Sequence, residues 1–162
     1  FKCSVSAYND NEEMIMKVFK KGKSNKTFLK EVDLHRAAAE IGVAPPIIDF
    51  YVGGTDSKKG AQSYIVMEQL DRTVLNIIKS QKALTDSQWK EIINLYRKLD
   101  TISILHNDAN PNNLMYQFHP VPRFFLIDFG MSKRARGNVE ISYQLLRTRL
   151  LREEKLFSNS SG

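Results

Sequence analysis

LHNDANPNNL at residues 105–114 and LIDFG at residues 126–130 are the two stretches that decide the fold. In the first, Asn113 follows Asp108 by five positions, and in the second, Asp128 stands directly before a Phe-Gly pair. Phosphoryl transfer needs one carboxylate near the attacking hydroxyl, and an amide and a second carboxylate that hold Mg²⁺ on the nucleotide phosphates. The two stretches therefore predict a phosphoryl-transfer site, and the rest of the chain has to supply the residues that bind the nucleotide.

The composition is that of an ordinary globular protein. The 162 residues are 42% hydrophobic and 26% charged, enough for one domain or two small lobes. No apolar run reaches the roughly 18 residues of a membrane span, and no mixture of aromatic and basic residues indicates nucleic-acid binding. The single cysteine excludes an internal disulfide. Together with the absence of a visible signal peptide, it predicts a cytoplasmic protein.

The net charge of +6 has two interpretations. Lysines and arginines can form a solvated surface, or they can attract ATP, an acidic partner or a membrane surface. We favour the solvated surface because charge runs usually have no further function.

The first half of the chain predicts strands around one helix. Strands are expected at residues 1–8, 13–19, 47–52 and 63–67, and a helix at residues 27–41 with Phe28, Leu29, Val32, His35 and Ala39 at helical spacing. Lys17 is the one charged residue in the apolar run at residues 14–19, and Glu31 lies within the helix. By itself, Lys17 is equally well explained as a surface lysine on an edge strand, and Glu31 as an exposed helical glutamate would indicate no function.

The second half predicts mostly helices. A short helix is expected near residues 72–80. The capping-box pattern TDSQ at residues 85–88 opens a longer helix with an apolar face. A hairpin is expected from residues 114–118 and 124–127, and a last helix at residues 138–154.

Several motifs in the same order resemble the eukaryotic-like protein kinase superfamily. MIMK at residues 14–17 is similar to the Val-Ala-Ile-Lys strand, YIVMEQL at residues 64–70 to the strand that enters the hinge, and HND at residues 106–108 to His-Arg-Asp. The resemblance implies an α+β, bilobal protein-kinase-like fold with a small antiparallel β N-lobe and a truncated α-helical C-lobe. The lobes are expected at residues 1–70 and 71–157, followed by a disordered tail at 158–162.

The resemblance also implies residue roles in the N-lobe. Lys17 would hold the α- and β-phosphates of ATP as a catalytic residue, and Glu31 would pair with Lys17. Backbone groups near Glu68 and Leu70 would bind the adenine edge, with Met67 at the back of that pocket.

In the C-lobe, the resemblance makes Asp108 the residue that orients, and can deprotonate, the acceptor hydroxyl. Asn113 and Asp128 would bind Mg²⁺, and Asn110 would donate a hydrogen bond to the γ-phosphate. His106 is expected to pack and to form hydrogen bonds without a catalytic role.

The chain departs from the kinase pattern in four places. None of the sixteen residues before Lys17 is glycine, so the first strand and the Gly-rich loop are expected to be missing or replaced. Asn107 stands where the family has Arg, which predicts an enzyme that activation-loop phosphorylation does not switch. Asn110 stands where Ser/Thr kinases usually have Lys, and no Ala-Pro-Glu follows Gly130.

These departures resemble the minimal kinases. That group includes compact bacterial effector kinases such as OspG and NleH, reduced viral kinases and the small kinase of the KEOPS complex. The resemblance implies a protein substrate and an activating or docking protein partner.

Three functions agree with the sequence. The leading hypothesis is ATP- and Mg²⁺-dependent phosphoryl transfer to Ser or Thr of a protein, including the chain itself. The second is a small-molecule phosphotransferase of the aminoglycoside or choline kinase kind, with which Asn110 is compatible. The third is a kinase-fold binding module that acts through a partner, which the missing Gly-rich loop favours.

Overall fold

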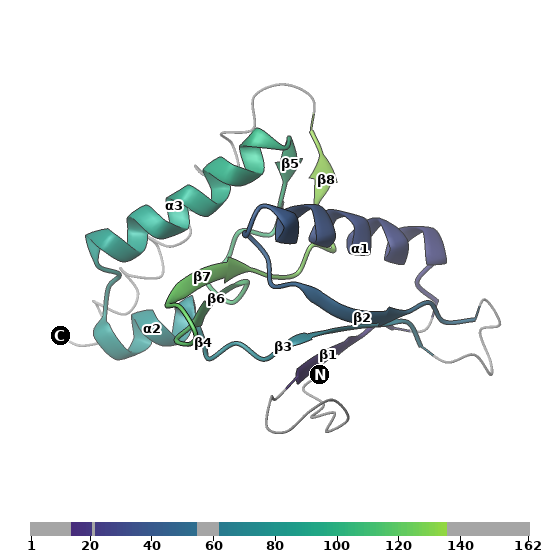
Figure 1. The fold of residues 1–162 in the computed structure, drawn as a ribbon, viewed down its shortest axis with the longest axis horizontal. Coiled ribbons are helices and arrows are strands. Elements are labelled where there is room, and N and C mark those ends of the chain that lie inside the picture. Colours follow the sequence, from purple (N-terminus) through teal and green to yellow (C-terminus); the bar gives the residue numbers. More distant parts are fainter. Residues whose placement is uncertain (1–13, 21, 55–61, 136–162) are drawn as a thin grey trace. The chain divides into compact units, whose positions relative to one another are not determined.

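A computed structural model describes residues 14–20, 22–54 and 62–135. It contains two compact units: the first unit lies within residues 1–69 and the second unit within residues 70–162. Figure 1 shows the elements of both.

Antiparallel strands and helices make up both units. Among the described residues every strand pair is antiparallel, and there are three helices. This mixture is consistent with the expected kinase-like fold. The predicted strand at 1–8, helix at 138–154 and tail at 158–162 lie outside the described residues. None of the described helices has both the length and the hydrophobicity that crossing a bilayer requires.

The first unit contains a three-stranded sheet and one helix. Its elements are β1 (Met14–Val18), α1 (Asn25–Glu40), β2 (Ile47–Tyr51) and β3 (Tyr64–Glu68). The strand order is β1-β3-β2, and Lys17 of β1 lies opposite Ile65 of β3. The strands predicted at 13–19, 47–52 and 63–67 are thus confirmed, with small differences at their ends.

Helix α1 begins slightly earlier than predicted because Ser24 caps it. The Ser24 hydroxyl accepts a hydrogen bond from the Thr27 backbone N–H at 3.2 Å, which satisfies one of the free donors of the first turn. After the helix ends, Gly42 adopts a φ of 75°, which glycine tolerates without strain.

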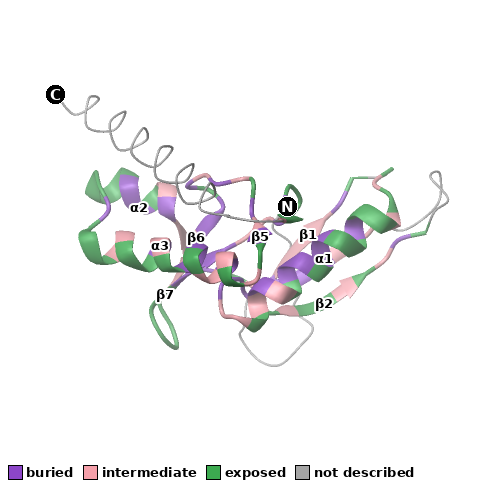
Figure 2. Ribbon diagram, turned by 90° about the horizontal axis from the view of Figure 1, so that it is seen from above, coloured by how far each residue is buried: buried purple, intermediate pink, exposed green. Residues whose placement is uncertain are grey.

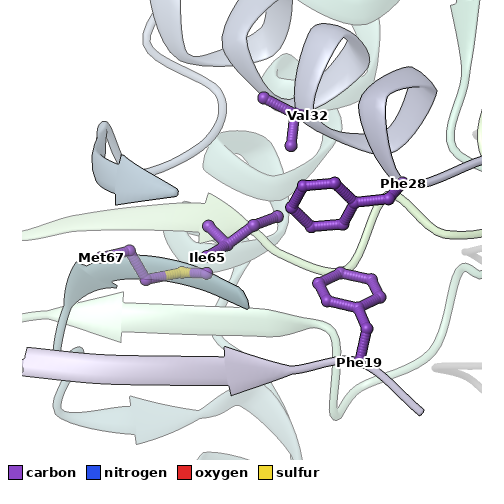
Figure 3. Packing of buried hydrophobic residues seen from close by; sticks show 5 residues of the cluster. All are labelled: Phe19, Phe28, Val32, Ile65 and Met67. Carbon is purple, nitrogen blue, oxygen red and sulfur yellow. The ribbon is translucent and has the colours of Figure 1, made fainter. Parts of the chain in front are cut away.

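The core of the first unit forms between α1 and the sheet. Phe19, Phe28, Val32, Ile65 and Met67 make up one buried cluster (Figure 3). The rings of Phe19 and Phe28 meet edge to face, with centroids 4.9 Å apart, a favourable aromatic geometry.

The buried face of α1 differs from the predicted one. The predicted face included Leu29, whose side chain is 45% exposed. Glu31 is buried instead, at 3%, because it lies three positions after Phe28 on the same helical face. His35, which the predicted face included, is buried at 2% as expected. Figure 2 shows how buried and exposed residues alternate along α1.

The second unit contains more strands than expected: the sequence predicted mostly helices with one hairpin. Its elements are β4 (Arg72–Thr73), α2 (Val74–Gln81), α3 (Asp86–Thr101), β5 (Ile104–Leu105), β6 (Leu114–Gln117), β7 (Arg123–Leu126) and β8 (Lys133–Arg134). The strands form two sheets, β4-β6-β7 and β5-β8. The predicted hairpin is confirmed as β6 and β7, while β4, β5 and β8 are too short to leave a periodic signal.

The predicted capping box at the start of α3 is confirmed. The Thr85 hydroxyl accepts from the Gln88 backbone N–H at 3.1 Å, and the Gln88 side chain accepts from the Thr85 N–H at 2.9 Å. The buried face of α3 packs against β5, which leads into the predicted catalytic loop, and against β7, which leads into the Asp128 segment. The cap therefore helps to support that loop.

Thr85→Ala should lower the free energy of unfolding by about 1 kcal/mol, because it leaves the Gln88 N–H without its acceptor. Trp89 is the only tryptophan and lies on α3, so its fluorescence during urea unfolding reports this helix. The matched control is Ser87→Ala, an exposed position in the same turn. Equal unfolding midpoints for the two variants would contradict the importance of the cap.

Candidate active site

The predicted catalytic loop leaves β5 and returns into β6. Asn107 adopts a φ of 62°, a left-handed conformation that asparagine tolerates better than most residues. A turn then joins the Asn113 N–H to the Asn110 carbonyl at 3.0 Å. This turn places both asparagine side chains beside Asp108.

Two amides hold the Asp108 carboxylate. Asn113 Nδ2 donates to Oδ2 at 2.9 Å, and Asn110 Nδ2 donates to Oδ1 at 3.2 Å. Asn113 Nδ2 also donates to the Asp108 backbone carbonyl at 3.0 Å. A carboxylate held at both oxygens has a fixed orientation, which suits a group that has to meet an acceptor hydroxyl.

The same contacts decide which end of the Asn113 amide can bind a cation. The NH₂ group of Asn113 donates both of its hydrogen bonds to Asp108. The Asn113 amide oxygen cannot take this place, because the Asp108 carboxylate would repel it. The amide oxygen Oδ1 is therefore the end left for a ligand, and an amide oxygen is a hard donor of the kind that Mg²⁺ prefers.

Asp128 lies between β7 and β8 in a strained backbone conformation. Its φ is 63°, and its Oδ1 accepts a hydrogen bond from the Gly130 N–H at 3.3 Å. Such strain in a non-glycine residue is typical of functional sites. The neighbouring Ile127 N–H donates to the Asn113 carbonyl at 2.9 Å, which links the Asp128 segment to the catalytic loop.

The donor set of these segments fits Mg²⁺ bound together with a nucleotide. Among the described residues, no three His, Cys, Asp or Glu side chains gather into a metal site. Mg²⁺ in kinases takes few protein ligands and completes its coordination with phosphate oxygens and water. One amide oxygen from Asn113 and a carboxylate from Asp128 agree with that pattern.

His106 supports the loop from inside the second unit, as the sequence predicted. The ring is fully buried, Nε2 lies 2.8 Å from the Ile127 carbonyl, and Nδ1 accepts from the Asp108 N–H at 3.3 Å. Its ring also meets Phe129 edge to face at 5.0 Å. Burial lowers the pKa of His106, so the ring is neutral, donates through Nε2 and accepts through Nδ1.

Tyr96 of α3 brings a second polar group into the same interior. Its side chain is fully buried, and its hydroxyl has no hydrogen bond to a described residue. Burial, and then the negative charge of Asp108, raise the pKa of Tyr96, so the hydroxyl keeps its proton. Helical spacing places Tyr96 on the apolar face predicted for this helix, but spacing does not reveal the charge of Asp108 nearby.

In the first unit, the predicted pairing of Lys17 with Glu31 is confirmed. Lys17 Nζ lies 2.8 Å from Glu31 Oε2. A second lysine, which the sequence analysis missed, lies on the other oxygen: Lys23 Nζ is 3.3 Å from Oε1. No motif includes Lys23, and its loop position carries no periodic signal.

The residues predicted to bind adenine lie at the end of β3 and just beyond it. Met67 is buried, Glu68 is half-buried at the last position of the strand, and the Leu70 side chain is buried in the second unit. Their part in nucleotide binding stays a prediction.

The known proteins and the protein family that this chain resembles are kinases. A model of the lipopolysaccharide kinase (Kdo/WaaP) family matches residues 11–155. A 3-deoxy-D-manno-octulosonic acid kinase of Mannheimia succiniciproducens is 30% identical over 95 residues, covering 56% of this chain and 40% of that protein.

Protein kinases are also similar. Mitogen-activated protein kinase 13 of Arabidopsis thaliana is 26% identical over 170 residues, covering 98% of this chain and 45% of the kinase. Mitogen-activated protein kinase 7 of the same plant is 29% identical over 97 residues, covering 57% of this chain and 26% of the kinase. The chain thus spans less than half the length of these relatives. The narrower resemblance to effector, viral and KEOPS kinases has no support in these matches.

The buried histidines predict a pH dependence of stability. Burial lowers the pKa of both His35 and His106 in the folded protein, below the value of 6.5 for an unperturbed histidine. Below about pH 6.5, the unfolded chain therefore binds protons that the folded chain does not, and stability falls as the pH falls. Each histidine contributes at most about 1.4 kcal/mol per pH unit.

Urea unfolding at pH 5.5, 6.5 and 7.5 measures this dependence. His106→Asn should be less stable than the wild type at pH 7.5, because it loses the buried ring contacts, but should show a shallower loss of stability toward pH 5.5. His119→Asn changes an exposed side chain and should keep the wild-type slope. A wild-type slope in His106→Asn would show that this ring does not titrate as described.

Proposed function

The chain belongs to the lipopolysaccharide kinase (Kdo/WaaP) family, and on this basis we propose that it transfers a phosphoryl group from ATP to a sugar hydroxyl. The acceptor class that we propose is a 3-deoxy-octulosonic acid of lipopolysaccharide, by analogy with the similar kinase from Mannheimia succiniciproducens. The observation that carries the proposal is the Asp108 carboxylate, held at both oxygens by amides within the matched region.

Each site residue has a role in this proposal. Asp108 orients the acceptor hydroxyl and takes its proton. Asn113 Oδ1 and the Asp128 carboxylate hold Mg²⁺, which bridges phosphate oxygens and neutralises charge that develops on them. Asn110 supports Asp108 through its amide, and we retain a contact between Asn110 and the γ-phosphate as part of the proposal.

In this proposal, residues between Lys17 and Leu70 bind the nucleotide. Lys17, held by Glu31, binds the α- and β-phosphates. Met67, together with backbone groups of Glu68 and Leu70, binds adenine. Because ATP is a cytoplasmic nucleotide, the proposal places the chain in the cytoplasm.

Phosphoryl transfer to Ser or Thr of a protein is the second candidate. The observation that favours it is the alignment with mitogen-activated protein kinase 13, which spans nearly the whole chain. Asn110 favours the sugar acceptor, because this position is a neutral amide where Ser/Thr kinases usually have lysine. The activating or docking protein partner belongs to this second candidate.

Transfer of radiolabelled phosphate from ATP tests the proposed role of Asp108. The acceptors are a 3-deoxy-octulosonic acid glycoside and a basic protein rich in Ser and Thr, each with Mg²⁺. Asp108→Asn should lower kcat by about 10²–10⁴, the range of general base catalysis. Asn113→Ala should also lose activity, whereas Asn112→Ala, its exposed neighbour, should not.

The acceptor that becomes labelled decides between the two candidates. Label on the glycoside alone supports sugar kinase activity, and label on the protein alone overturns it in favour of the second candidate. Undiminished transfer by Asp108→Asn would overturn the assignment of this site.

Binding of the Mg²⁺–nucleotide complex should raise the melting temperature. At a ligand concentration one hundred times Kd, the stabilisation is about 2.7 kcal/mol. Asp128→Asn should lose the part of the shift that requires Mg²⁺ and keep the part caused by ATP alone. ATP without Mg²⁺, and Mg²⁺ without ATP, are the controls. An unchanged Mg²⁺-dependent shift in Asp128→Asn would contradict its role as a ligand.

A further inference from the structure

Two lysines share one buried carboxylate in the first unit. Glu31 is 3% exposed, and its two oxygens contact different ammonium groups: Lys17 at 2.8 Å and Lys23 at 3.3 Å. We call these three residues the lysine–glutamate triad.

Both lysines of the triad also lie over the same aromatic ring. Lys17 Nζ is 4.9 Å and Lys23 Nζ 4.5 Å from the centroid of Phe19, within the range of cation–π attraction. The two ammonium groups therefore have the same two kinds of contact, a carboxylate oxygen and an aromatic face. Their side chains are also similarly accessible, at 32% and 27%.

The turn after β1 brings Lys23 back to this place. Gly22 has a φ of 93°, which favours glycine, and a Cβ there would meet nothing within 4 Å. The Lys23 N–H then donates to the Lys20 carbonyl at 3.4 Å, and Ser24 caps α1 directly afterwards. Lys23 is thus the residue directly before the N-cap of the helix that carries Glu31.

The triad has a positive charge that the single pair lacks. One lysine and one glutamate sum to zero, whereas two lysines and one glutamate sum to +1. Two ammonium groups so close together repel each other, and an anion between or beside them relieves that repulsion. A phosphate group is an anion that lysine binds well as a point charge.

We propose that Lys23 is a second phosphate-binding lysine, which acts with Lys17 on the phosphates of the nucleotide. This inference rests on the proposed function, since it takes ATP as the ligand. Glu31 holds both ammonium groups in place, and each lysine side chain keeps roughly a third of its surface exposed, where phosphate oxygens can approach it. Lys23 therefore contributes to affinity for phosphates and not to affinity for the nucleoside.

Calorimetric titration of the chain with ATP, ADP and adenosine tests the proposal. Lys23→Met should weaken ATP binding roughly tenfold, the loss of one charge-assisted hydrogen bond, and should leave adenosine binding unchanged. Lys23→Arg keeps the charge and should bind ATP within about threefold of the wild type. Lys20→Met is the matched control from the same loop, because Lys20 is exposed and its side chain is not part of the triad.

The outcomes separate this inference from the proposed function. If the wild type binds ATP and Lys23→Met binds it equally well or more tightly, the role of Lys23 is overturned while the proposed function stands. If Lys23→Met weakens adenosine as much as ATP, the effect is structural and the inference also fails. If the wild type binds no nucleotide, both are overturned.

Discussion

A buried carboxylate has to be paired with positive charge. In the first unit, the buried carboxylate is that of Glu31. Its helix buries Phe28 and Val32 against the sheet, and that packing carries Glu31 into the same interior. An unpaired carboxylate there would be costly, because burial removes its hydration. The position of Lys17 on β1 and the turn that returns Lys23 both satisfy this requirement.

The second unit solves a comparable problem with neutral groups. Asp108 receives two amide donors, and the buried His106 ring joins the backbone of Asp108 to that of Ile127. Because the ring is neutral, these contacts cost no buried charge. These hydrogen bonds therefore hold the loop in one conformation. A functional side chain needs such support to keep its orientation.

Family membership changes the interpretation of several unusual residues. Compared with protein kinases, the chain has Asn110 in place of the usual lysine and Asn107 in place of the usual arginine. The match to the lipopolysaccharide kinase (Kdo/WaaP) family spans residues 11–155 and so includes both positions. In the structure, Asn110 supports the Asp108 carboxylate, which is a positive reason for an amide at this position.

The sequence by itself determined the local elements and the residue types of the site. The capping box at Thr85 and the alternating or helical spacing of apolar residues are local signals, because they depend on contacts between residues that are close together in the sequence. Only the tertiary structure decided that Glu31 is buried while Leu29 is exposed, and that Lys23 reaches the same carboxylate as Lys17. Spacing along a helix specifies a face, but it does not state which face the sheet will cover or which loop will return to it.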